Sequence, residues 1–468
     1  MVSAGGDKTV SFGNPHKPPG HARPRAPALP KLSDPATIMA TMARVQGNNA
    51  GSAVIPQSSL QSSPVRRLLH SRLGGLPRPF WVLWGGTLAN RIGYLVEPFL
   101  ALYLSSARGL SLAATGTVLA ANGAGSVFSQ LAGGVLADRI GRRATLTFGM
   151  LANAVALITL GYVHGFITLL VATFALGLTI DIYRPAASAL VADLIPPTER
   201  PRAFGLLFWA INLGFSIAMV LGGLLARAGF VWLFWCDAVT CAAFGLMVWR
   251  AVPETRATRE GVARDPGRFI DVLRDPVMVM FVLLGFATTF VYMQAYTTLP
   301  LTMKISGLAP PAYGLAMAVN GLAIIAIQPF AGTWLGRHDH TTVLACGSVL
   351  LGTGFGLTSL AAETWSSGAT VFVWTLGEIV TASVGLAIVA SLAPVHLRGR
   401  YNGVYGVAFS AGYLVAPLGG TRLLAQGRPV LWLTCAGLCA VAAVGQFALS
   451  PAIRRRAAFL SADSGDDQ

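Results

Sequence analysis

The chain has 468 residues, of which 54% are hydrophobic and only 11% charged, and its mean hydropathy is +0.61. Soluble domains carry about 25% charged residues, so this composition argues against a soluble globular protein. Lys and Arg exceed Asp and Glu by 34 to 19, which alone could indicate nucleic-acid binding. The basic residues lie mostly in the N-terminal region and in short gaps between apolar runs. This distribution favours a membrane protein with no nucleic-acid partner.

Residues 1–75 are rich in Pro, Gly, Ser, Ala and basic side chains and show no sustained apolar period. Such a composition predicts a disordered basic cytoplasmic tail. The pattern of a secretory signal peptide does not occur in it. An organellar transit peptide, or a start at Met39 or Met42, are the alternatives that the sequence leaves open.

The five cysteines are odd in number, lie in apolar segments and lack paired CxxC spacing. They are therefore interpreted as buried hydrophobic side chains, with neither a disulfide framework nor a metal site. No cofactor is expected.

From residue 80 to residue 449, apolar stretches of bilayer-spanning length alternate with short polar breaks. These stretches are too long for barrel strands, and backbone groups in hydrocarbon must be satisfied within the segment, so each is predicted to be a helix. The predicted fold is an all-α membrane protein with twelve transmembrane helices, at 80–105, 111–137, 144–163, 166–192, 203–227, 230–251, 276–303, 311–334, 341–362, 367–394, 400–425 and 427–449.

The basic residues between these stretches predict the orientation, because cytoplasmic loops carry an excess of Lys and Arg. With the N-terminus inside, 27 basic residues lie on the cytoplasmic side and four outside. Both termini are therefore predicted to be cytoplasmic.

A charged segment at 252–275 divides the spans into an N-terminal bundle, 80–251, and a C-terminal bundle, 276–449, followed by a cytoplasmic tail at 450–468. The two bundles repeat at an offset of 198 residues: LVADLIPPTERPRAFG from Leu190 aligns with IVASLAPVHLRGRYNG from Ile388. One offset that holds across several helices indicates two six-helix repeats, an arrangement that places a substrate site between them.

A short motif lies between the second and third spans, running Gly134-Val-Leu-Ala-Asp138-Arg139-Ile-Gly141-Arg142-Arg143. It resembles the loop signature of the major facilitator superfamily, and the twelve spans, the repeat and the central linker fit the same family. The resemblance implies a cytoplasmic latch between the halves, with Asp138 facing the positive end of a neighbouring helix. A generic positively charged loop is the alternative.

The fifth span resembles, in part, the glycine-rich motif of drug:proton antiporters. Ala218 and Met219 stand where that motif has Gly-Pro, and Thr173 stands where the branch carries an arginine in span four. Plain helix packing is at least as good an explanation of the glycines. Those predicted to pack helices are Gly214, Gly222, Gly223, Gly412 and Gly420.

Charged residues inside spans are costly, so each suggests a function. Glu378, Asp181 and Glu97 are predicted to carry coupled protons, because no span contains a histidine. Arg91 and Arg184 complete this group, with Arg91 expected to pair with Asp181 across spans one and four; static salt bridges are the alternative. Asp237 and Arg422, nearer the span ends, are interpreted as snorkelling side chains.

Polar and aromatic side chains on the same helical faces suggest a cavity for an apolar or amphipathic organic ligand. Ordinary core packing is the alternative for the aromatic members. The predicted cavity residues are Asn90, Tyr94, Tyr292, Gln294, Tyr296 and Trp374.

The resemblance implies a secondary transporter, with proton-coupled efflux of a drug-like compound as the leading hypothesis and proton-coupled nutrient uptake as the alternative. A polytopic enzyme or receptor is a remote third, because no phosphate loop or nucleophile constellation occurs. The expected partners are a small-molecule substrate, protons and membrane lipid. The chain is expected to act as a monomer in the inner cell membrane.

Overall fold

The computed structural model describes residues 76–463, except 197, 255–271, 336 and 395–396. The predicted N-terminal tail and most of the predicted linker lie outside the described residues. Within the described part, every regular element is helical.

The described residues of the first half contain eight α-helices and one π-helical turn. The bounds are α3 (Arg78–Ile92), α4 (Val96–Leu102), the π-helical turn η1 (Tyr103–Ala107), α5 (Leu112–Ile140), α6 (Arg142–Tyr162), α7 (Phe166–Ile180), α8 (Tyr183–Leu194), α9 (Arg200–Ala228) and α10 (Val231–Ala251), with η1 continuing directly from α4.

The second half contains three short or broken segments followed by five long helices. The bounds are α12 (Pro276–Tyr292), α13 (Gln294–Thr297), α14 (Leu299–Ile305), α15 (Pro310–Leu335), α16 (His340–Leu357), α17 (Thr364–Leu392), α18 (Arg398–Gln426) and α19 (Arg428–Asp463). Across the described residues, nine helical stretches are individually long and apolar enough to cross a membrane.

Each of the twelve predicted spans coincides with a helix or with a run of broken helices. The first, fourth and seventh spans are interrupted, as α3–α4–η1, α7–α8 and α12–α13–α14. Pro98, Pro185 and Pro300 follow these breaks, and proline has no N–H to donate to the carbonyl four residues earlier. At the other end of the chain, α19 continues as a helix to Asp463, past the predicted span end at 449.

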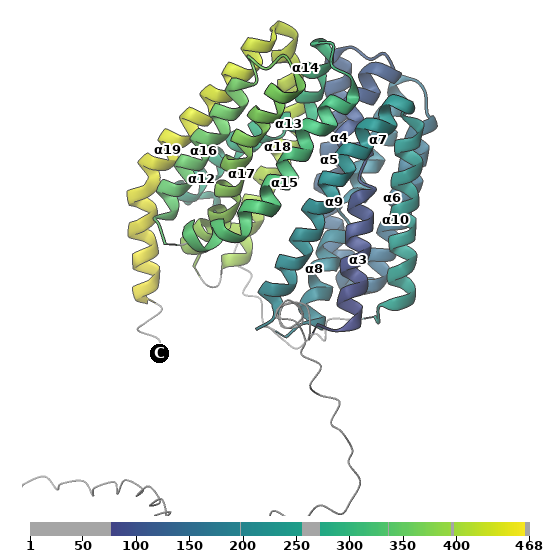
Figure 1. The fold of residues 1–468 in the computed structure, drawn as a ribbon. Helices are drawn as coiled ribbons and strands as arrows, with labels where there is room; N and C mark the ends of the chain where they lie inside the picture. The colour runs from purple at the N-terminus through teal and green to yellow at the C-terminus, as the bar shows by residue number, and fades with distance from the viewer. Residues whose placement is uncertain (1–75, 197, 255–271, 336, 395–396, 464–468) are drawn as a thin grey trace, which may run out of the picture. The chain divides into compact units, whose positions relative to one another are not determined.

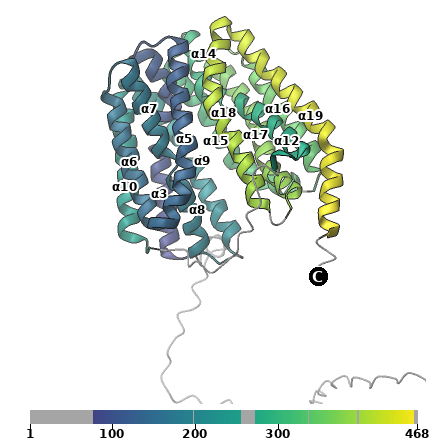
Figure 2. The same ribbon diagram turned by 180° about the vertical axis from the view of Figure 1, so that it is seen from behind.

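The helices pack mainly within each half, and two pairs of long helices join the halves: α9 with α15, and α5 with α18. Figures 1 and 2 show α3 beginning and α19 ending at the same end of the helices. We call this end the terminal end and the opposite one the distal end.

The contacts between the halves follow the sequence repeat. Gly116 on α5 lies against the carbonyl of Pro417 on α18, and Gly314 on α15 lies against the carbonyl of Met219 on α9. A Cβ on these glycines would lie 2.8 Å and 2.2 Å from the two carbonyl oxygens. Both pairs of positions differ by 198 residues. The same repeat unit therefore builds both contacts, and glycine is needed because the backbones approach too closely for a side chain.

The packing inside each half repeats in the same way. Gly214 on α9 lies against Arg91 of α3, and Gly412 on α18 lies against Thr289 of α12, again 198 residues away. The other three predicted packing glycines also lie at close contacts: Gly222 against Phe99, Gly223 against Pro311, and Gly420 against Gln294.

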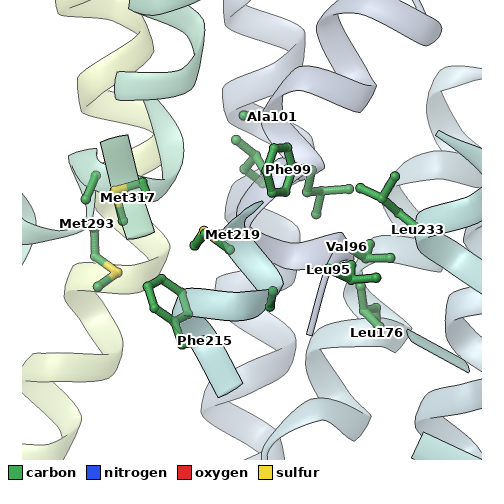
Figure 3. Close-up of a cluster of buried hydrophobic side chains, with 14 of the residues drawn as sticks. Leu95, Val96, Phe99, Ala101, Leu176, Phe215, Met219, Leu233, Met293 and Met317 are labelled. Carbon is green, nitrogen blue, oxygen red and sulfur yellow. The ribbon is translucent and has the colours of Figure 1, made fainter. Parts of the chain in front are cut away.

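Buried apolar side chains join the two halves near these contacts. Figure 3 shows Phe215 and Met219 of α9 between Met293 and Met317 of the second half and Phe99 of the first. Met219 and Met317 are fully buried. This continuous packing occupies the distal part of the junction, where the glycine contacts lie.

Candidate functional site

A cavity of about 570 Å³ lies between the two halves. Near the start of α9, at the terminal end, it is lined by Phe204, Leu207 and Phe208, and two of these are exposed: Phe204 and Phe208. The glycine contacts between the halves lie toward the distal end. The cavity therefore opens toward the terminal end. Most of the side chains predicted to serve proton coupling or substrate binding line it: Asn90, Arg91, Tyr94, Glu97, Asp181, Arg184, Tyr292, Tyr296 and Glu378.

Asp181 lies in the break between α7 and α8. Its carboxylate accepts a hydrogen bond of 2.7 Å from Ser126 on α5 and pairs with Arg184 one turn later, at 3.3 Å. Its backbone N–H donates to Ser129. The break thus places a carboxylate on the cavity wall with its backbone polar groups bonded, as the membrane interior requires.

Arg91 contacts two tyrosines instead of forming an ion pair with Asp181, the predicted partner. Its guanidinium donates a hydrogen bond to the hydroxyl of Tyr183 and lies 5.0 Å from the ring centre of Tyr94. No ion pair joins Arg91 to Asp181 in this conformation in the part of the chain that the structure describes, so their pairing stays a prediction. Its physical premise was that depth along the helix decides the partner, whereas Asp181 is already taken by Ser126 and Arg184.

Glu97 accepts a hydrogen bond from the hydroxyl of Tyr94, one turn earlier. Tyr94 lies in the break between α3 and α4, Glu97 lies at the start of α4, and both line the cavity. Asp237 of α10 is buried beside them and accepts hydrogen bonds from backbone N–H groups at this break. The interpretation of Asp237 as a snorkelling side chain is therefore wrong, because it lies inside the first half with its acceptors occupied.

Glu378 forms the acidic centre of the second half. Its carboxylate accepts hydrogen bonds from the hydroxyl of Tyr292 on α12, at 2.8 Å, and from the amide of Asn320 on α15, at 2.6 Å. Tyr296 lies 3.2 Å from the Tyr292 hydroxyl, and Asn320 also donates to Thr375. No lysine or arginine forms an ion pair with Glu378 in the part of the chain that the structure describes.

Two predicted cavity residues do not line the cavity. Gln294 is fully buried, and its side chain bonds to the carbonyls of Phe290 and Ala416 and to the hydroxyls of Thr297 and Thr298. It therefore holds the broken seventh span against α18. The other, Trp374, is packed in the core of the second half.

Trp374 is fully buried and stacks on Phe355, with ring centres 5.2 Å apart. Its edge-on contact with Tyr292 makes it a support for a cavity residue. The cavity-lining or supporting polar residues that the sequence did not indicate include Ser126, Tyr183, Asn320 and Tyr413. Nothing in their local sequence sets them apart from other polar side chains in spans.

Acids outnumber basic groups among the described lining residues. Glu97, Asp181, Asp237 and Glu378 face two arginines, Arg91 and Arg184. The described residues include no group of three or more His, Cys, Asp or Glu that could hold a metal ion.

The predicted latch motif lies at the terminal end. Gly134 and Arg139 belong to α5, and Gly141 connects α5 to α6 with a positive φ of 97°. Arg142 pairs with Asp193 of α8 at 3.0 Å, which is a contact inside the first half. The side chain of Asp138 lies outside the described residues.

Glu254, directly after α10, binds the start of α6. Its carboxylate accepts the backbone N–H groups of Arg143 and Ala144, at 3.1 and 3.2 Å. A Cβ on Gly141 would lie 2.3 Å from this carboxylate, so the glycine makes room for it. Arg143 also stacks over Trp249, 4.4 Å from the ring centre.

Comparison with known proteins identifies the family. The model of the Major Facilitator Superfamily matches residues 83–309 and 295–461, once for each half. The chain belongs to the Major Facilitator Superfamily. It is a multi-pass membrane protein and a secondary transporter, not an enzyme.

Relatives in this superfamily cover most of the chain. The Na(+), Li(+), K(+)/H(+) antiporter of Planococcus maritimus is 24% identical, covering 72% of this chain and 87% of its own length. The multidrug resistance protein MdtH of Escherichia coli is 27% identical, covering 69% of this chain and 82% of its own length.

Solved structures of other transporters share the fold. A peptide transporter POT crystallised with sulfate has a TM-score of 0.70 at 19% identity, covering 83% of this chain and 99% of its own. The nucleoside transporter NupG, as a D323A mutant, has a TM-score of 0.68 at 13% identity, covering 80% and 100%. These identities are low, so the likeness concerns the fold alone.

Proposed function

We propose that this superfamily member is a proton-coupled antiporter that exports amphipathic organic compounds across the inner cell membrane. The observation that carries the proposal is Glu378, a carboxylate on the cavity wall that, among the described residues, is bonded only to the neutral groups of Tyr292 and Asn320. A buried acid without a cation can exist in either protonation state, as a coupling group must.

The opposite wall supplies a second acid in a different setting. Asp181 is paired with Arg184 and Ser126, so its charge is balanced in this conformation. Alternating access requires that such contacts change as the cavity switches sides. We therefore assign proton exchange first to Glu378, then to Asp181, with Glu97 third.

The cavity lining favours an organic substrate that carries a positive charge. Apolar and aromatic side chains such as Phe208, Phe215 and Tyr296 supply contact area, and acids outnumber arginines. A cationic amphipathic molecule would contact the rings and compete with a proton for the acids. Such competition couples export to proton entry without any direct contact between the two.

The relatives support antiport and also provide a second candidate. One relative is named a multidrug resistance protein, and another is named an antiporter of Na(+), Li(+), K(+) and H(+). The excess of acids in the cavity would also suit a monovalent cation. We favour the organic cation, because a cavity of about 570 Å³ is far larger than a bare ion needs.

Proteoliposomes that enclose a pH-sensitive dye test this choice. With an imposed proton gradient, an organic cation such as ethidium should dissipate the gradient through the wild-type protein but not through Glu378→Gln. Na⁺, K⁺ and a dipeptide form the other arms. Proton movement with Na⁺ or K⁺ alone would favour the ion exchanger, and movement with the dipeptide in the same direction as protons would favour uptake.

We further propose that both termini and the linker are cytoplasmic, and that the motif around Asp138 latches the halves in the other conformation. Asp138→Asn should then weaken transport while the protein still inserts, because one charge in a turn contributes little to folding. Arg139 to Lys, which keeps the charge, is a matched control in the same motif. Wild-type transport by Asp138→Asn would refute the latch.

A further inference from the structure

The break in the first span leaves backbone donors that its own helix cannot satisfy. The helix α3 ends at Ile92, and α4 begins at Val96. The N–H groups of Leu95 and Val96 both donate to one carboxylate oxygen of Asp237 on α10, each at 3.1 Å. In hydrocarbon an unsatisfied N–H costs several kcal/mol, so these bonds stabilise the broken conformation over a continuous helix.

Asp237 is itself held by a network inside the first half. It is 4% exposed, and its second oxygen accepts a weak hydrogen bond from the thiol of Cys241, at 3.5 Å. That sulfur in turn accepts hydrogen bonds from Asn90 on α3 and Asn153 on α6. The carboxylate therefore has a fixed position relative to three helices, α3, α6 and α10.

Close packing at Gly93 fixes the same break. A Cβ on Gly93 would lie 1.8 Å from the hydroxyl of Thr240, so α10 contacts the backbone of the break directly. The hydroxyl of Thr240 donates to the carbonyl of Asp237. The first span is thus attached to α10 both by hydrogen bonds and by steric fit.

We propose that Asp237 is a positioning residue, which fixes the break in the first span and thereby holds Tyr94 and Glu97 on the cavity wall. Tyr94 is one residue before the clamped N–H groups and Glu97 is one residue after them. A continuous helix would rotate and shift both side chains relative to the cavity. The inference rests on the proposed function, because that function gives Glu97 a part in proton coupling.

Amide hydrogen exchange of the purified full-length protein tests the positioning directly, without any transport. Asp237→Ala removes the acceptor, so the peptide covering residues 93–102 should exchange about tenfold faster or more, as expected for the loss of a bond to a charged acceptor. Asp237→Asn keeps an acceptor oxygen of similar shape and should stay close to wild type. Peptides from α16 provide the internal reference.

Gly93→Ala is a second variant that leaves the carboxylate in place. It pushes the break away from Thr240 and should also accelerate exchange in 93–102. Elution as a single monodisperse peak in detergent checks that each variant folds. Unchanged exchange in this peptide for a folded Asp237→Ala or a folded Gly93→Ala would overturn the proposal.

Transport assays test whether the positioning acts through Glu97. Asp237→Ala should lower proton-coupled transport to the level of Glu97→Gln. The double variant, with both substitutions, should show no greater loss than either single variant. Asp237→Asn should retain most of the wild-type coupling. Additive losses in the double variant would contradict the assignment. Full proton coupling in Glu97→Gln, with Asp237 intact, would instead refute the role of Glu97 in the proposed function. The amide hydrogen exchange of residues 93–102 would still decide whether Asp237 positions the break.

Discussion

The hydroxyl of Tyr292 on α12 donates a hydrogen bond of 2.8 Å to the carboxylate of Glu378 on α17, 86 residues away in sequence. Within the described part of the chain, Tyr292 and Asn320 are the hydrogen-bond partners of this acid, and both are neutral. A proton can therefore bind or leave without breaking an ion pair, and the neutral partners can serve either state.

Glu378→Gln should abolish transport driven by a pH gradient while sparing substrate exchange. Glutamine keeps the size of the side chain and one acceptor oxygen but cannot change its charge. Counterflow of labelled substrate measures exchange, and dye-loaded liposomes measure coupling. Glu199→Gln, an exposed acid at the start of α9, is the matched control and should keep both activities. Full coupling in Glu378→Gln would rule out the assignment.

Asp181→Asn should impair both exchange and coupled transport. The substitution leaves Arg184 without its 3.3 Å partner and weakens the bond from Ser126. Hydrogen bonds to charged groups contribute about 1.5–3 kcal/mol, and the exposure of Arg184 places the expected loss at the lower end, roughly tenfold in substrate affinity. Isothermal titration with an organic cation measures it. Unaltered affinity would show that the pair is only structural.

Side chains added at the junction glycines should favour the conformation that is open at the distal end. A Cβ at Gly123 would lie 2.6 Å from the carbonyl of Tyr413, and one at Gly321 would lie 2.1 Å from the hydroxyl of Ser216. Overpacking costs about 1–3 kcal/mol. That is enough to change a conformational equilibrium by roughly 5- to 150-fold.

Spin labels on Ser105 and Lys304 measure this shift, because these side chains lie 3.3 Å apart across the two halves at the distal end. With the native cysteines replaced, Gly123→Val or Gly321→Val should move the distance distribution to longer values. Gly437→Val is the control, since its position on α19 has open space for a side chain. An unchanged distribution in both junction variants would contradict the prediction.

Asp339 caps α16 and should stabilise the second half in a pH-dependent way. Burial alone would raise its pKa, but hydrogen bonds from Thr341 and Thr342 and the charge of Arg454 lower it overall. A lowered folded-state pKa means that this stabilisation is present at neutral pH. It begins to be lost as the pH falls below about 4, where the carboxylate of the unfolded chain gains a proton, and is gone once the pH has fallen through the lower pKa of the folded state.

Asp339→Ala should therefore lower thermal stability at pH 7, by about 0.5–2 kcal/mol as for other helix N-caps, and by less near pH 3. Thermal unfolding of the detergent-solubilised protein at both pH values measures the difference. Asp339→Asn should lose less, since asparagine also caps helices. An equal loss at both pH values would disprove the charge dependence.

Cysteine labelling in intact cells tests the proposed orientation. Cysteines at Thr255 or Thr258, in the segment between the halves, should react only with membrane-permeant maleimides, because basic segments of this kind stay in the cytoplasm. A cysteine at Ala309, in the short connection before α15, should react with impermeant reagents. Labelling of the cysteine at 255 or 258 by an impermeant reagent would contradict the proposed orientation.

The sequence by itself determined the class of fold and the repeat. Apolar runs of about 20 residues have few alternatives to helices in lipid, so composition alone places the helices, with ends that agree within a few residues for most spans. The repeat at an offset of 198 reappears as equivalent contacts at Gly116 and Gly314, because in both halves a helix packs closely against the backbone of a helix from the other half.

Helix breaks show the limit of local information. Proline follows each of the three breaks, yet Pro329 and Pro417 stand inside helices that continue. A break forms where another helix offers partners for the freed backbone groups, as Asp237 does for Leu95 and Val96. Those partners lie about 140 residues away, so no window of sequence contains them.

Tertiary structure alone decided which polar side chains meet in the cavity. Depth along a helix suggested Asp181 as the partner of Arg91. The rotation of each helix about its axis instead brings Arg91 into contact with Tyr183 and Asp181 into contact with Ser126. In the same way, Tyr292 faces the cavity while Gln294 is buried, although the two are only two positions apart in sequence. Hydropathy indicates that a residue lies in a span, but packing between helices determines the direction in which its side chain points.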